Sequence, residues 1–246
     1  MQLKTVVKEK LKPAPPRREV WNMFDRIANR YDFLNHLLSF GQDIVWRRKV
    51  SQYLPAKSNL SILDIATGTA DQLISLLNCS SKISSAVGID MAENMLHLAQ
   101  RKIARRGLEE IISIQEGNVD NLKFEDNCFD VVTIAFGIRN FEDVDKSLTQ
   151  IHRVLKTKGR LIILEFSIPT NKLFKRLYLF YFRKVLPTIG AIISGDRAAY
   201  RYLNETVETF PFGKEFRDIL SARGFAETGE ASLSWGIATI YYADKF

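Results

Sequence analysis

The feature that most constrains the fold of this 246-residue chain is a regular alternation of short apolar runs with helical segments, which begins at Leu60. Few polar residues interrupt the apolar runs, which is typical of strands buried on both faces of a parallel sheet. The pattern therefore predicts an α/β fold with helices on both faces of a mostly parallel sheet. The expected strands are residues 60–66, 85–90, 111–117, 129–137 and 159–166, and the expected helices between them are residues 71–78, 92–107 and 142–156.

The two ends of the chain depart from this rhythm. Residues 1–19 are basic and end in a cluster of prolines, so we expect a flexible basic arm there. Apolar residues at helical spacing follow, and they predict an N-terminal helical lid over residues 20–55. Near the C-terminus, residues 226–234 and 236–245 have the composition of strands and are separated by a very short connection. A hairpin of this kind predicts antiparallel pairing at one edge of the sheet.

A loop of small residues follows the first expected strand, in the stretch LDIATGTADQ over residues 63–72. A dinucleotide pyrophosphate needs the spacing Gly-x-Gly-x-x-Gly at this turn, whereas Gly68 is the only glycine in the stretch. The amides and hydroxyls around Gly68 and Thr69 can still hold a smaller polar group at the start of the next helix. The loop therefore argues against NAD and leaves other nucleotide-like ligands open.

Polar residues also end the next two expected strands. Asp90, at the tip of the second strand, is placed to accept hydrogen bonds from both hydroxyls of a ribose. After the third strand, Asn118 can bond to an adenine edge while Val119 packs on it. Each residue taken singly also fits a capping or turn role. Three such groups at three successive strand ends favour one shared ligand, and together they describe S-adenosylmethionine better than a dinucleotide.

Composition narrows the partners and the compartment. Lys and Arg number 35 against 28 Asp and Glu, and the net charge of +7 favours anionic surfaces without distinguishing nucleic acid from phospholipid. No RNA-binding module or alternation of aromatic and basic residues is visible, so we expect no nucleic-acid partner. The 2 cysteines and 3 histidines fit neither a disulfide framework nor a metal site. Without an apolar signal segment or a long apolar run, we expect a cytoplasmic protein.

Several stretches resemble the class I S-adenosylmethionine-dependent methyltransferases, and within them the C-methyltransferases of menaquinone and ubiquinone biosynthesis. The stretches that carry the resemblance are MFDRIANRYDFLNHLLSFGQDIVWRRK, LDIATGTAD, VGIDMAENML, FGIRNFEDVDKSLTQIHRVLKTKGRLIILEFS and YRYLNETVETFP. The resemblance implies a Rossmann-like fold with a mostly parallel seven-stranded sheet, one antiparallel edge strand and a methyltransferase domain over residues 56–246. It also implies S-adenosylmethionine as cofactor, no metal, and C-methylation of an isoprenoid quinol, most closely demethylmenaquinol.

The sequence departs from the family pattern at Ala70, Asn118 and Ala135, where glycine, aspartate and serine are common. We expect cofactor binding to survive, because the Asn118 carbonyl still accepts a hydrogen bond from the adenine amine. The residues expected to bind the cofactor are Gly68, Thr69, Asp90, Asn118 and Val119.

The stretch GIRN follows the fourth expected strand, on the rim that carries the cofactor loop. C-methylation of a quinol needs an activated ring carbon, and loss of a hydroxyl proton raises the electron density there. We expect Arg139 to stabilise the phenolate, directly or through an ordered water, and Asn140 to position it. Arg139 is a poor base because its pKa is too high. The alternative is that Arg139 pairs with a carboxylate such as Asp143 or Glu165 and shapes the loop.

Substrate contacts are expected from the lid and from the C-terminal part of the chain. Tyr31 either faces the ligands or packs on the domain edge, and Tyr200 either lines the substrate pocket or belongs to an ordinary packed helix. Residues 170–212 combine aromatic and basic side chains, which fits either a membrane-facing insertion that admits a polyprenyl chain or a helix that covers the sheet. The first alternative predicts peripheral contact with the inner face of the cell membrane.

Three other functions remain open at this point. They are methylation of another small molecule, methylation of RNA, and cofactor binding without catalysis. The choice between a naphthoquinol and a benzoquinol head group also stays open, as does the oligomeric state.

Overall fold

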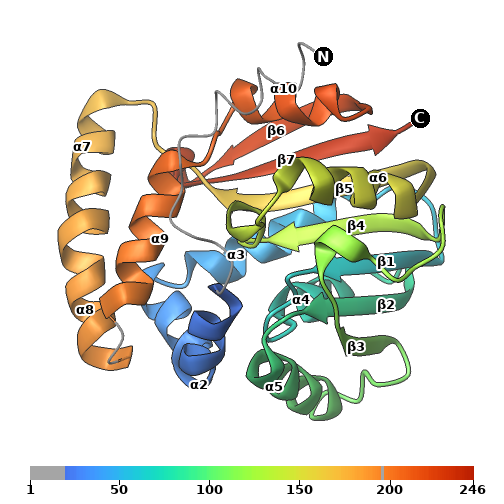
Figure 1. The fold of residues 1–246 in the computed structure, drawn as a ribbon, viewed down its shortest axis with the longest axis horizontal. Coiled ribbons are helices and arrows are strands. Elements are labelled where there is room, and N and C mark those ends of the chain that lie inside the picture. The colour runs from blue at the N-terminus through green and yellow to red at the C-terminus, as the bar shows by residue number, and fades with distance from the viewer. Residues whose placement is uncertain (1–19, 195–196) are drawn as a thin grey trace.

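A seven-stranded sheet forms the centre of the protein, whose computed structural model describes residues 20–194 and 197–246 (Figure 1). The strand order is β3-β2-β1-β4-β5-β7-β6, and only β7 runs antiparallel to its neighbours. The predicted sheet is therefore confirmed, with the detail that β7 lies between β5 and the edge strand β6. The strands are β1 (Leu60–Ile65), β2 (Ile83–Asp90), β3 (Ile112–Glu116), β4 (Phe129–Ala135), β5 (Leu155–Phe166), β6 (Phe225–Leu233) and β7 (Ala238–Lys245).

Alternate residues of the central strands enter two hydrophobic cores, one on each face of the sheet. In β1, Ile62 packs in one core and Leu63 in the other, and both side chains are fully buried. This burial on both faces explains the near-continuous apolar strands of the sequence. One core is covered by α3 (Gln42–Val50), α4 (Asp71–Cys79) and α5 (Glu93–Ala104), and the other by α6 (Val144–Val154) and α10 (Lys214–Ala222).

The strand order reverses between β1 and β4. From β1 the chain builds outward through β2 to β3, and it then returns to place β4 on the other side of β1. In an open α/β sheet a crevice forms at such a point, beyond the carboxyl ends of the strands, and ligands bind there. The topology therefore locates the site before any side chain is considered.

The remaining helices gather beyond the carboxyl ends of the parallel strands, at the left of Figure 1. They are α2 (Val20–Leu38), α7 (Lys172–Phe180), α8 (Leu186–Ser194) and α9 (Arg197–Thr209), with a π-helical turn at Tyr181–Val185 between α7 and α8. Buried side chains of these helices share a third core that includes Ile27, Leu34, Phe182 and Val207. These helices occupy the ranges expected for the lid and the insertion, whereas the expected basic arm lies outside the described residues. None of the helices described has the length and apolarity needed to cross a membrane.

Candidate active site

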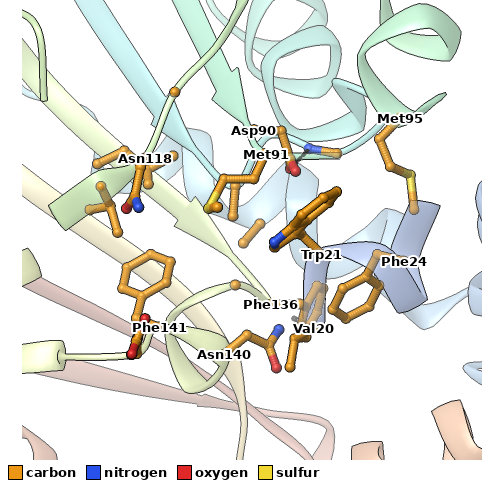
Figure 2. Close-up of a pocket in the computed structure, with 18 of the residues that line it drawn as sticks. Val20, Trp21, Phe24, Asp90, Met91, Met95, Asn118, Phe136, Asn140 and Phe141 are labelled. Atoms are coloured by element: carbon orange, nitrogen blue, oxygen red, sulfur yellow. Dashed lines mark hydrogen bonds between the residues drawn. The ribbon is translucent and has the colours of Figure 1, made fainter. Parts of the chain in front are cut away.

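A cavity of about 150 Å³ opens where the strand order reverses, at the carboxyl ends of β1 to β4. The start of α2 closes it from outside, and Figure 2 shows Trp21 and Phe24 of this helix on the same side as Asp90 and Met91. The sequence predicted a ligand site at these strand ends, and the structure brings most of the proposed residues together. The predicted site residues that line this cavity are Tyr31, Gly68, Asp90, Asn118, Val119 and Asn140.

Two glycines near the cavity lie where neighbouring residues leave no room for a side chain. A Cβ on Gly137 would lie 2.6 Å from the Cβ of Ala66, and a Cβ on Gly88 would lie 2.8 Å from the hydroxyl oxygen of Thr67. Gly68 differs from these, because its φ of 55° is left-handed and nothing lies within 4 Å of the place a Cβ would take. Backbone, not side chain, therefore forms the cavity wall at Gly68.

Asp90 is held by the backbone on both of its carboxylate oxygens. The Gly68 N–H donates to Oδ2 at 2.8 Å and the Ala92 N–H donates to Oδ1 at 3.0 Å. Burial raises the pKa of Asp90, and these backbone donors act in the opposite direction. A carboxylate has about four acceptor positions, and backbone groups at Gly68, Ala92 and Met91 occupy some of them. The fixed oxygens can therefore still accept a hydrogen bond from a hydroxyl group of a ligand.

Asn118 caps a short 3-10 helix, Val119–Asn121, and its Oδ1 accepts the Asp120 N–H at 2.9 Å. This bond uses one lone pair of the carbonyl that was expected to meet the adenine amine. Asp120, which the sequence reasoning missed, also lines the cavity, and its carboxylate accepts a hydrogen bond from Ser147 at 2.7 Å. Val119 and Phe141 also line the cavity and supply apolar surface, and Figure 2 shows the Phe141 ring on the same side of the cavity as Asn118. The combination suits a flat ring with polar edges.

Thr69 does not line the cavity. Its hydroxyl donates to Asp32 of α2 at 2.6 Å and accepts from Lys102 of α5 at 2.9 Å. Lys102 also forms ion pairs with Asp32 at 2.6 Å and with Asp71 at 2.5 Å. The Thr69 side chain therefore links the loop to α2, a role that the spacing of the sequence did not reveal.

The two departures from the family pattern in and beneath the loop have different surroundings. Ala70 is fully buried with a φ of 64°, a left-handed conformation that costs a non-glycine residue about 1 kcal/mol. Ala135 lines the cavity at the end of β4. The glycine common at position 70 in the family suits this left-handed conformation, and this chain adopts the conformation with alanine in its place.

Asp64, in β1, stabilises the loop that follows this strand through a buried hydrogen bond with Thr67. It is 1% exposed, and the hydroxyls of Thr67 and Thr133 donate to its oxygens at 2.7 and 2.6 Å. Burial raises the pKa of Asp64 to about 6, although both hydroxyl donors lower it. The carboxylate is buried under the loop that follows β1 and is not part of the cavity wall.

A second cavity, of about 220 Å³, adjoins the first, and Phe24, Tyr31 and Phe136 line both. Its wall is mostly aromatic and aliphatic, and α2, α3, α7, α8 and α9 all contribute to it. The charged side chains in this wall are Asp43, Arg47 and Arg139. The sequence analysis assigned no role to Asp43 and Arg47, although both lie in a stretch that carries the family resemblance.

Arg139 is held inside an ion pair. It is 3% exposed, and its Nη1 donates to Glu165 Oε1 and to the Phe136 carbonyl, each at 2.6 Å. The pairing with Glu165 is the alternative considered from the sequence, whereas Asp143 instead caps α6. The buried Nε of Arg139 has no partner among the described residues. Arg139 thus shapes the loop and still carries a donor without a protein acceptor.

The two predicted catalytic residues line different cavities. Asn140 lines the first, with a buried and unpartnered Oδ1, and Arg139 lines the second. Tyr31 stands between them because it lines both cavities. Tyr200 lies in α9, but its side chain falls outside the part of the structure described here, and nearby Tyr202 lines the second cavity.

Comparison with known proteins identifies the family. The sequence profile of the ubiE/COQ5 methyltransferase family matches residues 6–245. The chain belongs to this family. A demethylmenaquinone methyltransferase of Bacteroides fragilis is 41% identical over 242 residues, covering 96% of this chain and 98% of the relative. The corresponding protein of Thermus thermophilus is 45% identical over 91% of this chain and all 100% of its own length. A ubiquinone/menaquinone biosynthesis C-methyltransferase UbiE of Geotalea uraniireducens is 44% identical, covering 92% and 96%.

Solved structures share the fold at much lower identity. The [4+2]-cyclase SpnF superposes with a TM-score of 0.68 at 16% identity, covering 95% of this chain and 98% of the cyclase. A SAM-dependent methyltransferase of Thermotoga maritima gives 0.66 at 20% identity, covering 92% and 100%. One of these is named for a cyclisation, so the fold alone does not define the reaction.

As a member of this family the protein is an S-adenosylmethionine-dependent methyltransferase. The first cavity fits that cofactor. Asp90 offers a fixed carboxylate for the ribose, Asn118 and Asp120 offer acceptors at the far end, and the backbone at Gly68 leaves room beside the first strand. The apolar surface of Val119 lies where the adenine would pack.

Proposed function

We propose that this enzyme transfers a methyl group to a ring carbon of a demethylated isoprenoid quinol, converting demethylmenaquinol to menaquinol. The observation that carries this proposal is the cavity of about 220 Å³, with its mostly aromatic and aliphatic wall, beside the cofactor cavity. Because Phe24, Tyr31 and Phe136 line both cavities, a flat apolar ring in the second can present its edge to the first. The relatives named as demethylmenaquinone methyltransferases support the same substrate.

The bound cofactor supplies a methyl group that is already activated by the positive charge on sulfur. The chain's task is to align the ring carbon and to exclude water. Asp90 holds the ribose end of the cofactor cavity, and Tyr31 orients the ring where the cavities meet. Helix α2 covers both cavities, and we propose that it acts as the lid.

Arg139 would stabilise the negative charge that develops on the ring oxygen. Its ion pair with Glu165 holds the guanidinium in place, and its Nε is a donor without a protein partner. Asn140, with an unpartnered Oδ1 at the first cavity, would position the reacting edge of the ring.

Arg139→Ala tests this role. We expect kcat to fall by about 100-fold, the usual cost of losing one donor to a developing oxyanion. The dissociation constant of the cofactor should remain nearly unchanged, because Arg139 does not line the first cavity. Measurements of kcat, and of cofactor binding by calorimetry, distinguish a role in catalysis from a role in shaping the loop. An equal loss of both would show that Arg139 only shapes the loop.

The substrate itself is tested by parallel assays of methyl transfer from labelled S-adenosylmethionine. Short-chain demethylmenaquinol and the corresponding demethylated benzoquinol are the two acceptors. Methylation of the naphthoquinol supports the proposal, and methylation of both extends it to the ubiquinone pathway. Absence of transfer to either quinol, with cofactor binding intact, would contradict it and favour another small molecule, RNA or a non-catalytic role.

We further propose peripheral contact with the membrane through α7. Leu173, Leu177 and Phe180 are 72%, 61% and 65% exposed, and their spacing places them on one face of the helix. An aliphatic and aromatic face flanked by cations suits the boundary between lipid head groups and acyl chains. The exposed cations of α7 and of the turn after it are Lys172, Lys175, Arg176, Arg183 and Lys184, of which Arg183 pairs with Glu208.

Flotation with anionic phospholipid vesicles tests this contact. Each cation near such a surface contributes about 1 kcal/mol, so a triple reversal of Lys175, Arg176 and Lys184 to Glu should weaken vesicle binding at least about 100-fold. The control reverses two other exposed cations, Arg101 of α5 and Arg105 directly after it. Helix α5 lies far from α7 in Figure 1. Equal binding of the wild type and the α7 variant would remove the membrane proposal.

A further inference from the structure

Methylation of a quinol carbon requires loss of a ring hydroxyl proton, and the guanidinium of Arg139 cannot accept it. We propose that Asp43 is the base that takes this proton and that His36 passes it to solvent. This inference rests on the quinol methylation proposed above and adds a proton acceptor to it.

Asp43 is the only carboxylate in the wall of the second cavity among the described residues. It lies in the first turn of α3 and is 3% exposed, so its charge is largely shielded from water. Other polar groups in the wall include Asn35 and Gln42, which are not bases at neutral pH. If the quinol ring occupies this cavity, Asp43 is the group able to accept a proton there.

A hydrogen-bonded chain connects Asp43 to the surface. Nδ1 of His36 lies 2.7 Å from Asp43 Oδ2, and the Ser39 hydroxyl donates to Asp43 Oδ1 at 2.7 Å. The His36 side chain is 38% exposed. Histidine exchanges protons readily near neutral pH, so an exposed histidine behind a buried carboxylate can return the proton to water.

The turn between α2 and α3 creates this chain. Phe40 and Gly41 both have left-handed backbones, with φ of 53° and 72°, and they reverse the chain direction within a few residues. The Gly41 N–H donates to the His36 carbonyl at 2.7 Å, which closes the end of α2. The reversal places His36, in the last turn of α2, beside Asp43, in the first turn of α3.

Positive charges face the same cavity. Arg47 lies one turn along α3 from Asp43, and Arg139 comes from the loop after β4. The Nε atoms of both arginines are buried and have no protein partner among the described residues. These cations stabilise the ring oxygen once its proton has left.

The proton balance is complete without another reactant. The ring O–H bond breaks and an O–H bond forms on the Asp43 carboxylate, while the electron pair moves through the ring to the carbon that attacks the methyl group. The carbon–sulfur bond of the cofactor breaks and its electrons neutralise the sulfonium. Protonated Asp43 then donates to Nδ1 of His36, and the other ring nitrogen releases a proton to water. When the ring regains aromaticity, the methylated carbon gives its hydrogen as a proton to the Asp43 carboxylate, which returns it to the ring oxygen, so one proton in all reaches water for each methyl group transferred.

Asp43→Asn tests the base while preserving the shape of the side chain. General-base catalysis contributes about 100-fold or more, so kcat with demethylmenaquinol should fall by about that factor. The KM and the dissociation constant of the cofactor should change less than about threefold, because the cavities keep their shape. Asp145→Asn on α6 is the matched control, since it also removes a carboxylate from an ion pair and lies outside both cavities. It should keep the wild-type kcat.

A substrate analogue separates the chemical role from a structural one. A ring-fluorinated demethylmenaquinol has more acidic hydroxyls and needs less help from a base, so the defect of Asp43→Asn should shrink at least about tenfold with it. A purely structural role, such as capping α3 together with Ser39, would give the same defect with both quinols. His36→Gln leaves Asp43 in place and should lower kcat about tenfold, which keeps the inference testable if Asp43→Asn folds poorly.

Two results would overturn the inference while leaving the proposed function intact. One is wild-type kcat in a folded Asp43→Asn variant, and the other is an equal defect with the fluorinated and ordinary quinols. Failure of the wild type itself to methylate either quinol would instead refute the proposed function, and the inference with it.

Discussion

The two adjoining cavities are built in opposite ways. The first cavity, where we propose that the cofactor binds, is formed mainly by residues at or shortly after the ends of consecutive strands, such as Gly68, Asp90 and Asn118. The second cavity, where we propose that the quinol binds, is formed mainly by side chains of helices that lie far apart in the sequence, such as Asp43 of α3 and Tyr178 of α7. A site at strand ends follows from the order of the elements, whereas a site between helices depends on how those helices dock.

The charged groups of the two cavities are also held differently. Asp90 is fixed by backbone N–H groups at Gly68 and Ala92. Arg139 is fixed by the Glu165 side chain. Backbone donors survive most substitutions, whereas a side-chain partner can be removed by a single mutation. Single substitutions should therefore disturb the second cavity more easily than the first.

The largest expected effect is on stability, in Glu165→Ala. This change leaves the buried Arg139 charge without its partner, which costs about 3 to 5 kcal/mol of the free energy of unfolding. Urea titration measures the loss. The double variant Glu165→Ala with Arg139→Ala should lose less than the sum of the single changes, because no isolated charge remains. If the losses of the free energy of unfolding were additive, the ion pair between Arg139 and Glu165 would not be what stabilises the wall of the second cavity.

Among changes at the first cavity, Asp90→Ala should weaken cofactor binding most directly. Loss of two charged hydrogen bonds of about 1.5 kcal/mol each should raise the dissociation constant of S-adenosylmethionine about 100-fold. Calorimetry measures this constant. Glu93→Gln, at a position 85% exposed and nearby at the start of α5, is the control and should bind normally. If Asp90→Ala binds as tightly as the wild type, the ribose does not rest on this carboxylate.

Buried Asp64 predicts a pH dependence of stability beneath the cofactor loop. Its pKa is about 6 in the folded protein against an ordinary value of 3.8, so the folded state binds more protons between these values. The contribution of Asp64 to the free energy of unfolding therefore falls as the pH rises through that range, by up to about 3 kcal/mol. Asp64→Asn should remove this fall, which urea titrations at about pH 4 and pH 7 would detect.

Asp130 provides a control of opposite sign. Burial raises the pKa of its carboxylate, but the bonds from Lys57, Ser61 and Lys156 outweigh this and hold the pKa below its ordinary value. Asp130 therefore adds stability above its unfolded pKa, and Asp130→Asn should lose stability at neutral pH. If the free energy of unfolding depended on pH in the same way in both variants, the raised pKa of Asp64 would be contradicted.

The smallest effect is expected from Lys102→Met, which cuts the link between the lid and the cofactor loop. Lys102 joins Asp32 of α2 to Asp71 and Thr69, so its loss should cost about 1 to 2 kcal/mol of the free energy of unfolding. Hydrogen exchange of α2 should quicken more than that of the sheet. Arg101→Met, at an exposed position on the same helix, is the control. Unchanged exchange in α2 would show that the lid is held by its apolar contacts alone.

Much of the cofactor site could be predicted because it depends on local pattern. Apolar runs located the strands, and the residues at their ends, Asp90 and Asn118, lie at the cavity as expected. Thr69 shows the limit of this reasoning. Its place in the loop was correctly inferred, but its hydroxyl bonds to Asp32 and Lys102, which no local spacing could indicate.

The sequence by itself determined the sheet, its mostly parallel order and the rim on which the cofactor site lies, because strand periodicity and loop chemistry act over a few residues. Only the tertiary structure decided which partner Arg139 takes and that Asp43 faces a cavity backed by His36. The physical reason is that docking of α2, α3 and α7 depends on the shape of a shared core, to which many distant residues contribute weakly.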